Sequence, residues 1–522
     1  MNRLLLLIVL GTFGCGAKKS FTDRDGPRQD GVFVASIGIN PATLDPALSQ
    51  DSVTNDLMAH VHEGLVGWGS DGRIEPRLAE RWEISPDGTT YTFHLRSGLT
   101  FHNGADLSAA DVKWSWERAC DPRLESPIPE DYLGDIVGVA EVIAGKAKEI
   151  TGVRVIDPST VEVRLLSPRA FFLGKLTYPI ASVLPKEFIP KGESVGSAKQ
   201  MIGAGPFRVT SFTPEAEVKL ESFAGHFQGE PKVRELTYLV IKDASTRVNL
   251  LRSGKLDWAG LPPTDVEAFR NDSEFVLREN DRPGTFYVGM NGKVYPPFAD
   301  VRVRRAFNHA VDREVLVHDL LGGFGKVADG ILPPSVPNLE RTKPTLGYDP
   351  AKAKALIAEA GWTGKLPLLE LVVSDPTGDR KRMAEFIVSM LRENLGVDAR
   401  VRQVESSVLI HKATRKELGF FMGSWYMDYL DPENLLSGLL SSRGQNRTAW
   451  VNQKFDALCA KGDIMPDGPE RMRVYAEAED LAIIDAVWIP LYHPREVVAV
   501  RKGIDGFTSN PLGMLPPASL TR

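Results

Sequence analysis

The chain has 522 residues, with 62 Lys and Arg against 68 Asp and Glu, so its formal net charge is −6. Hydrophobic residues make up 43% and charged residues 25%, which is typical of a soluble globular protein and excludes a disordered chain or a fibrous repeat. The length indicates about three folding units. A mildly acidic chain lacks the basic excess of nucleic-acid-binding proteins, so no nucleic acid partner is expected.

The first 15 residues have the pattern of a secretory signal. Arg3 is followed by a run of seven apolar residues and then by small residues before Cys15. The run is far shorter than the ~20 residues needed to span a bilayer as a helix. Ending on Gly14 and Cys15, the segment looks like a bacterial lipoprotein signal, whose cysteine is lipidated, although Thr12 stands where Leu is usual. A plain cleaved signal is the alternative.

Residues 16–30 are polar and without periodicity, so we expect a flexible tether between the lipid and the folded body. No other segment is long and apolar enough to cross a membrane. The mature protein is therefore expected in the periplasm or cell envelope, attached to the membrane through the lipid anchor only. Cys120 and Cys459 could pair in such an oxidising compartment, but two free, buried cysteines are the preferred interpretation.

Three segments alternate in hydrophobicity with period two, and each is predicted to be a strand. They are residues 90–95, which follow the turn at 86–88, and residues 161–165 and 236–240. Helix signals fall between the strand signals along the chain. This alternation predicts a mixed α/β fold.

Two helices have clear start signals. Ser108, with Asp111 three residues later, forms a start that resembles a capping box. Asp349 and Pro350 supply an N-cap and an N1 proline for a second helix, which is expected to end at Gly361.

Turn-rich breaks in the chain are candidate crossings between lobes. They lie near residues 68–72, 190–192, 282–284 and 490–494. The preferred organisation has three lobes, of which the first is discontinuous and receives the chain back at its C-terminus.

Motifs of enzymes do not hold up in this chain. Residues 192–196 match the G-x-S-x-G pattern around Ser194, but that nucleophile needs a core strand directly before it, and the proline-containing segment 184–190 predicts none. His60 and His62 supply at most two ligands where a metal site wants three or four, and exposed helix or loop residues are the preferred interpretation. We therefore expect no catalytic residues, no metal and no cofactor.

A series of short motifs follows in a fixed order along nearly the whole mature chain. They are Pro41–Pro46, Glu63–Val66, Pro76–Trp82, Ser85–Arg96, Phe101–Val112, Gly203–Phe207, Asn291, Val301–Arg313 and Trp425–Pro432. In order and spacing these motifs resemble the peptide-binding family of ABC-transporter solute receptors, the bacterial extracellular solute-binding family 5. The resemblance covers about residues 32–520, with Ala204 at a position where the family commonly has Thr.

The resemblance implies an α/β fold of the periplasmic-binding-protein type II class. In this Venus flytrap, two lobes close on a ligand, and an additional domain is present. Lobe I is expected to comprise residues 31–68, 185–282 and 491–522, the additional domain residues 69–184, and lobe II residues 283–490.

The resemblance also implies a set of ligand-binding residues. The α-amine of a peptide is cationic, so a buried carboxylate must meet it, and in the family this is the aspartate of the W-x-x-D segment, here Asp428. From the residues alone, a turn cap is the favoured interpretation of Asp428. Trp425 is expected to form an aromatic wall, and Glu63 to face ligand side chains. Tyr426 and Tyr429 are expected to contribute hydroxyls, with core packing as an equal alternative.

One departure from the family leaves the anchor for the peptide carboxylate undefined. A basic residue can lie three positions before the tryptophan in relatives, whereas this chain has Met422 there. Arg415, Arg443 and Arg447 are candidates that the sequence does not rank. A receptor without a fixed anchor would tolerate several peptide lengths or take a different ligand.

The function implied by the resemblance is capture of peptides and their delivery to the permease of an ABC importer, by a monomer that is not an enzyme. Three alternatives stay open. The same receptor fold could carry a non-peptide cargo such as a metal complex, a glycan or haem. The chain could instead be an exported hydrolase that uses Ser194, or a lipid-tethered sensor or chaperone.

Overall fold

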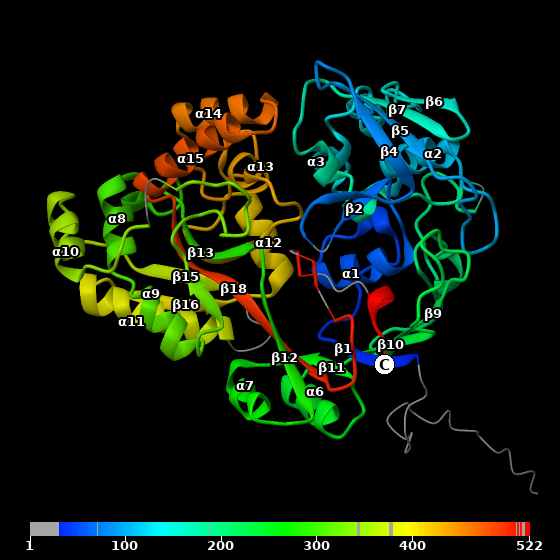
Figure 1. The fold of residues 1–522 in the computed structure, drawn as a ribbon. Helices are drawn as coiled ribbons and strands as arrows, with labels where there is room; N and C mark the ends of the chain where they lie inside the picture. The colour runs from blue at the N-terminus through cyan, green and yellow to red at the C-terminus, as the bar shows by residue number, and fades with distance from the viewer. Residues whose placement is uncertain are drawn as a thin grey trace, which may run out of the picture.

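The structure, a computed structural model, describes residues 31–521 apart from 70, 187, 342–344, 375–378, 508, 511 and 514–516. The predicted signal, the lipidation site Cys15 and the tether lie outside the described residues. Figure 1 shows two bodies side by side, joined by long strands at their base. We call residues 31–281 with 495–521 the N-terminal body and residues 284–494 the C-terminal body.

The N-terminal body contains a four-stranded sheet in the order β1-β10-β9-β8. Strands β1 and β10 pair in parallel, and the other neighbours are antiparallel. Helix α1 (Ser52–Val61) begins at its N-cap Asp51 and buries Leu57, Met58 and Val61 in the core of this sheet. The strands are β1 (Val32–Ile37), β8 (Phe207–Thr213), β9 (Glu217–Ser222) and β10 (Glu235–Val240).

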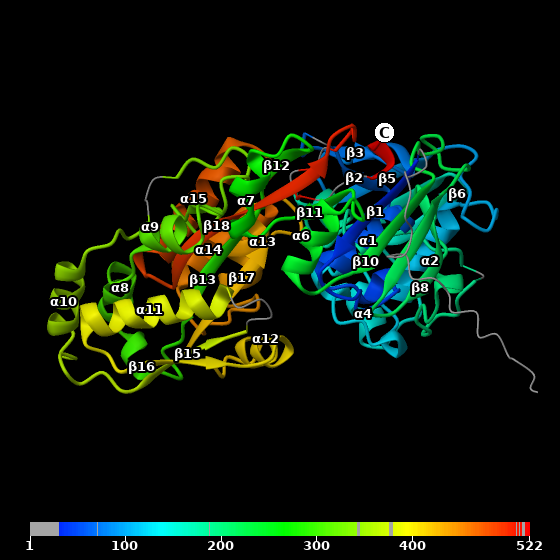
Figure 2. The same cartoon turned by 90° about the horizontal axis from the view of Figure 1, so that it is seen from below.

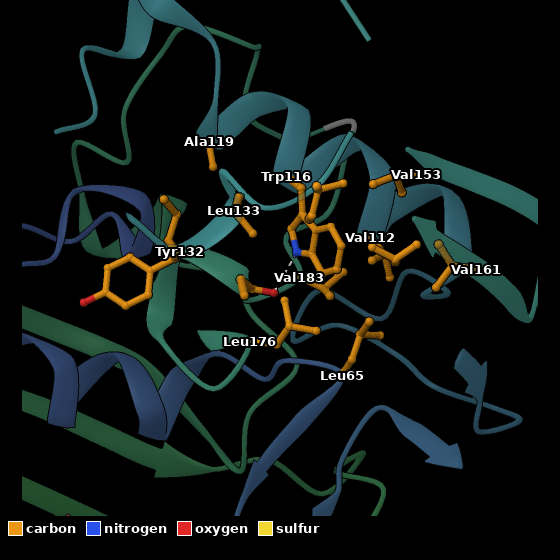
Figure 3. Close-up of a cluster of buried hydrophobic side chains, with 14 of the residues drawn as sticks. Leu65, Val112, Trp116, Ala119, Tyr132, Leu133, Val153, Val161, Leu176 and Val183 are labelled. Atoms are coloured by element: carbon orange, nitrogen blue, oxygen red, sulfur yellow. Dashed lines mark hydrogen bonds between the residues drawn. The ribbon is translucent and has the colours of Figure 1, made fainter. Parts of the chain in front are cut away.

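A second four-stranded sheet of the N-terminal body is antiparallel, in the order β4-β5-β7-β6. Helix α2 (Ala109–Ala119) covers it, and Figure 3 shows Trp116 of α2 at the centre of the core, where its Nε1 donates to the carbonyl oxygen of Ala181 at 3.0 Å. The other elements are β2 (Val66–Trp68), β3 (Ile74–Pro76), β4 (Ala79–Ile84), β5 (Thr90–Leu95), β6 (Val153–Asp157), β7 (Thr160–Arg164), α3 (Pro129–Leu133), α4 (Val139–Ile143) and α5 (Phe172–Lys175).

An eight-stranded sheet joins the two bodies. Strand β18 has 14 residues and passes from one body to the other, because its first half pairs with β13 and its second half with β12 and β11. The strands are β11 (Trp258–Gly260), β12 (Phe275–Asp281), β13 (Gly284–Met290), β14 (Gly325–Val327), β15 (Leu369–Val373), β16 (Ala399–Gln403), β17 (Phe420–Tyr426) and β18 (Trp488–Arg501).

Helices cover both faces of this sheet in the C-terminal body, and two more lie beside β11 and β12 (Figures 1 and 2). Across the described residues, no helix is both long and apolar enough to span a bilayer. The helices are α6 (Ala244–Arg252), α7 (Pro263–Arg270), α8 (Val301–His309), α9 (Arg313–Val315), α10 (Pro350–Glu359), α11 (Asp379–Leu395), α12 (Ser406–Thr414), α13 (Pro432–Leu435), α14 (Gln453–Ile464) and α15 (Pro469–Ile484).

Several local predictions are confirmed. The strands predicted at 90–95, 161–165 and 236–240 are β5, β7 and β10, and the capping box of α2 is present. Asp349 caps α10 by accepting from the backbone N–H of Lys352, and the chain leaves that helix at Gly361 with a φ of +78°. Cys120 and Cys459 are buried and free, as expected.

Candidate ligand-binding site

The end of β17 and the turn after it place the predicted site residues at the junction between the two bodies. Asp431 fixes this turn, because its carboxylate caps α13 and accepts from the backbone N–H of Glu433 at 3.0 Å. Arg471 of α15, which is buried, donates to both carboxylate oxygens of Asp431 at 2.7 Å each. Asp431 is therefore the structural residue of the turn.

Asn434 of α13 orients the functional end of the turn. Its Oδ1 accepts from the indole Nε1 of Trp425 at 2.8 Å and from the backbone N–H of Asp428 at 3.4 Å. This one amide oxygen therefore fixes the position of the Trp425 indole relative to the backbone of Asp428.

The side chain of Asp428 is half-buried. Burial raises its pKa to about 6, and hydrogen bonds from the side chains of Tyr132 and Asn434 oppose that rise. A neighbouring carboxylate, Asp131, raises the pKa further. Among the described residues no basic side chain forms an ion pair with Asp428, so this acid is poised to bind a cation.

Tyr132 reaches Asp428 from the other body. Tyr132 lies on α3. Figure 3 shows its hydroxyl pointing away from the hydrophobic cluster that its ring adjoins. Tyr178 stacks on it with ring centroids 3.9 Å apart, and the Tyr178 hydroxyl donates to the carbonyl oxygen of Ser49 at 3.3 Å. No sequence pattern marks either tyrosine, since both lie far from Asp428 along the chain and carry no local motif.

Trp425 and Tyr426 point to opposite faces of β17, because successive side chains of a strand alternate. The guanidinium of Arg447 lies 5.6 Å from the ring centroid of Trp425. Tyr426 is 40% exposed, so it is not a core residue, and the guanidinium of Arg282 lies 5.6 Å from its ring centroid. Each aromatic side chain at the end of β17 therefore carries a cation on one face.

Tyr429 and Glu63 have partners of their own in this arrangement. The Tyr429 hydroxyl donates to Oε2 of Glu433 at 2.5 Å, and its ring stacks on Phe171 of the N-terminal body with centroids 6.3 Å apart. Oε1 of Glu63 lies 3.5 Å from Nε2 of His226. Tyr429 thus contributes its ring to a contact between the bodies.

The structure distinguishes among the three arginines that the sequence left unranked. Arg415 and Arg443 each pair with an acidic side chain, whereas Arg447 faces Trp425. The Nε of Arg447 is buried and has no hydrogen-bond partner among the described residues. The acidic partners are Glu417 for Arg415, at 3.0 Å, and Asp463 for Arg443, at 3.3 Å.

The expectation that His60 and His62 are exposed is wrong. They are 5% and 3% exposed, because α1 packs its inner face and its C-terminal end against the first sheet. Nε2 of His60 lies 2.8 Å from the hydroxyl oxygen of Tyr238, and burial lowers the pKa of both imidazoles to about 3. In the described part of the chain, no three His, Cys, Asp or Glu side chains are grouped so that they could hold a metal ion.

Comparison with known sequences assigns the family. The sequence profile of the "Bacterial extracellular solute-binding proteins, family 5 Middle" matches residues 73–447. The chain belongs to this family of solute-binding proteins. It is 30% identical to the Di/tripeptide-binding protein 2 of Pseudomonas aeruginosa over 90% of this chain and 91% of that one. It is 28% identical to the periplasmic oligopeptide-binding protein OppA of Escherichia coli over 91% and 90% of the two chains.

Solved structures confirm the predicted α/β fold of the type II periplasmic binding proteins for this solute-binding protein. The murein tripeptide binding protein MppA of Escherichia coli superposes with a TM-score of 0.84 at 23% identity, over 94% of this chain and 98% of that one. The unliganded open form of MppA superposes with a TM-score of 0.77 at the same identity, over 95% and 98% of the two chains. The arrangement of the two bodies therefore matches the first of these structures more closely than the open form.

Proposed function

We propose that this chain is a lipid-anchored receptor of the cell envelope that captures peptides between its two bodies and delivers them to the permease of an ABC importer. The observation that carries the proposal is Asp428, a desolvated carboxylate without a basic partner among the described residues, at the junction of the bodies. Relatives named as di/tripeptide-binding and periplasmic oligopeptide-binding proteins support it. Lipidation at Cys15, a monomeric state and the absence of catalysis belong to the same proposal.

In this proposal Asp428 binds the α-amine of the peptide. A charge-assisted hydrogen bond from an ammonium group is short and strong, and it restores the solvation that the carboxylate loses on burial. Tyr132 and Trp425 enclose the amine, whereas Tyr426 points to the other face of β17. Removing one partner of such a buried pair costs about 2–5 kcal/mol, which corresponds to a loss of affinity of roughly thirtyfold or more.

Arg447 is the proposed partner of the peptide carboxylate. Its guanidinium lies on the face of Trp425, and the indole nitrogen of that residue is tied to the amide that also holds the backbone of Asp428. The cation thus lies over the face of the Trp425 ring, and the backbone of the acid is tied to the amide that binds the edge of the same ring. In this proposal a bound peptide carboxylate supplies an acceptor for the buried Nε of Arg447, which has no partner among the described residues.

The two bodies are proposed to move as lobes about the crossings at residues 282–283 and 494–495, with the predicted additional domain, residues 69–184, as part of the first lobe. Peptide contacts both bodies, so binding shifts the population toward the closed form. The closed form is the one that would dock on the permease.

The first test is native mass spectrometry of the mature protein, purified without refolding from an exporting host. A ladder of adducts with peptide masses is expected. Calorimetric titration with trialanine then compares the free peptide with its N-acetylated and C-amidated forms. Asp428→Asn should lower the affinity for free trialanine roughly thirtyfold or more, and N-acetylation should add little further loss in that variant.

Matched variants assign the two ends of the peptide. Arg447→Gln should remove the preference for a free over an amidated C-terminus while keeping the preference for a free N-terminus. Glu141→Gln changes an exposed acid on α4 and controls for net charge. A single sharp adduct that persists unchanged in Asp428→Asn would contradict the peptide proposal.

A second candidate function is the binding of a non-peptide solute. It is favoured by a relative, 29% identical over 91% of this chain, that is named a probable deoxycholate-binding periplasmic protein in Escherichia coli. A bile acid has no amine for Asp428 to bind. Binding of deoxycholate that survives Asp428→Asn, without binding of trialanine, would select this candidate.

A further inference from the structure

A cavity of about 160 Å³ lies where α1 of the N-terminal body meets the strands that cross between the bodies. We call it the Asp56 cavity. Its walls combine apolar and polar side chains, and its charged groups come from α1, from β18 and from the residue that follows β12. The residues that matter here are Val53, Leu57 and Trp258 on the apolar side, and Asp56, Arg282 and Glu496 on the charged side.

The charged side of the cavity has an excess of negative charge. Its lining has two acids, Asp56 and Glu496, and one guanidinium, that of Arg282, so its formal charge is −1. Nη1 of Arg282 lies 3.4 Å from Oε2 of Glu496 and donates to the carbonyl oxygen of Gly513 at 2.9 Å. The carboxylate of Asp56 forms no ion pair or hydrogen bond with a described residue. Burial raises the pKa of Asp56 to about 7, and Arg282 only partly opposes this rise.

The cavity adjoins the proposed peptide site on two sides. Arg282 lines the cavity and also lies over the ring of Tyr426, at 5.6 Å from its centroid. Asn55, the residue before Asp56 on α1, forms a side-chain hydrogen bond with Tyr178, whose ring stacks on Tyr132. These contacts connect the cavity to Tyr426 and, through Tyr178, to Tyr132, whose side chain hydrogen-bonds Asp428.

We propose that the Asp56 cavity binds a lysine or arginine side chain of the captured peptide, and that the receptor prefers short basic peptides. This inference rests on the proposed function. The alkyl stem of a lysine packs on Val53, Leu57 and Trp258, while its ammonium group meets the carboxylate of Asp56, which has no cation of its own. The volume suits a single side chain, since an engineered cavity of about 150 Å³ holds a benzene molecule.

The experiment compares tripeptides of alanine in which one position at a time carries lysine, norleucine or glutamate. Norleucine has the same stem as lysine without the ammonium group, so the ratio of the two affinities isolates the charge. At one position, lysine should bind at least tenfold more tightly than norleucine, and glutamate should bind more weakly than either. In Asp56→Asn the ratio of lysine to norleucine should fall to about one, while in Glu141→Gln it should keep its wild-type value.

The outcomes separate this inference from the proposed function. One outcome is that trialanine binds while the lysine and norleucine peptides have equal affinities at every position. In that case the cavity does not distinguish a charged side chain from an apolar one, and only this inference fails. A tenfold ratio that persists in Asp56→Asn also overturns it. If no tripeptide binds, the proposed function fails, and the inference fails with it. Glu496→Gln provides a second variant, which should reduce the ratio if Asp56→Asn does not fold.

Discussion

At the scale of single residues, several acidic side chains near the junction between the bodies have raised pKa values. Burial raises the pKa of Asp428 to about 6 and that of Asp56 and Glu433 to about 7. For Glu433, the nearby cation of Lys175 partly opposes the rise. A cationic ligand favours the ionised form of an acid, so binding at Asp428 must release its proton whenever the pH lies below its pKa.

Binding of a free peptide amine should therefore weaken in acid. The groups that face Asp428 are the side chains of Tyr132 and Asn434 and the carboxylate of Asp131, whose own pKa is raised by burial. Below pH 6 the affinity for trialanine should fall by up to about tenfold per pH unit, because one proton must leave for each amine bound. Calorimetry between pH 4.5 and 7.5 would measure this slope.

The same titration has two internal controls. N-acetylated trialanine, which has no amine, should show a flatter profile, and so should Asp428→Asn with the free peptide. An equally steep profile in Asp428→Asn would show that another group controls the pH dependence and would remove Asp428 from the amine site.

At the scale of elements, a buried ion pair fixes the second sheet of the N-terminal body to the first. Arg118 of α2 and Asp45, in the segment between β1 and α1, are both fully buried and hydrogen-bonded to each other. The carboxylate of Asp45 also accepts from the backbone N–H groups of Ala47 and Val195, at 3.0 and 2.9 Å. This pair connects three segments that are distant in sequence.

Arg118→Met should lower the free energy of unfolding by about 3–5 kcal/mol, because it leaves the carboxylate of Asp45 buried without its cation. The double variant Arg118→Met/Asp45→Asn should recover part of this loss. Urea denaturation at pH 7 would measure both. Arg154→Met is the control, since the pair of Arg154 with Glu162 is 67% and 28% exposed and should contribute less than about 1 kcal/mol. A loss that small for Arg118→Met would contradict a structural role for the pair.

The elements also show what the sequence can predict. The start of α2 at Ser108 and that of α10 at Asp349 depend on contacts within one turn of helix, so local patterns suffice. The burial of His60 could not be predicted from local patterns, because it depends on how α1 packs against β8 and β10. Asp428 is recognisable only through the resemblance to a family, since its environment comes from a different body.

The partners of the site residues could not be predicted for the same reason. Tyr132 and Tyr178 reach Asp428 from the N-terminal body, and Arg282 reaches Tyr426 because the chain crosses between bodies beside β18. No periodicity or motif marks such positions. Only the pairing of β18 with strands of both bodies brings them together.

At the scale of the whole molecule, the two bodies touch through a few side chains. Tyr429 belongs to the buried cluster of the N-terminal body, where its ring stacks on Phe171. A Cβ atom at Gly174 would lie 3.0 Å from the Cβ of Tyr429, so the backbone of α5 approaches this residue closely. Nη1 of Arg169 donates across the junction to the carbonyl oxygen of Asp463 at 3.3 Å. These contacts exist only while the bodies lie together.

In the proposed lobe motion the Tyr429 contact belongs to the closed arrangement, so Tyr429→Ala should shift the population toward the open form. An aromatic pair contributes about 0.5–1.5 kcal/mol beyond the area that it buries, so the affinity for trialanine should fall by roughly two- to tenfold. Small-angle scattering should show that the variant needs more peptide than the wild type to reach the same compact radius of gyration. Tyr429→Phe is the matched control: it removes the hydroxyl bonded to Glu433 but keeps the ring on Phe171. If the ring drives closure, this variant should behave as the wild type does. If instead Tyr429→Phe loses as much affinity as Tyr429→Ala, the hydroxyl is the important group, and Tyr429 acts within the ligand site and not as a contact between lobes.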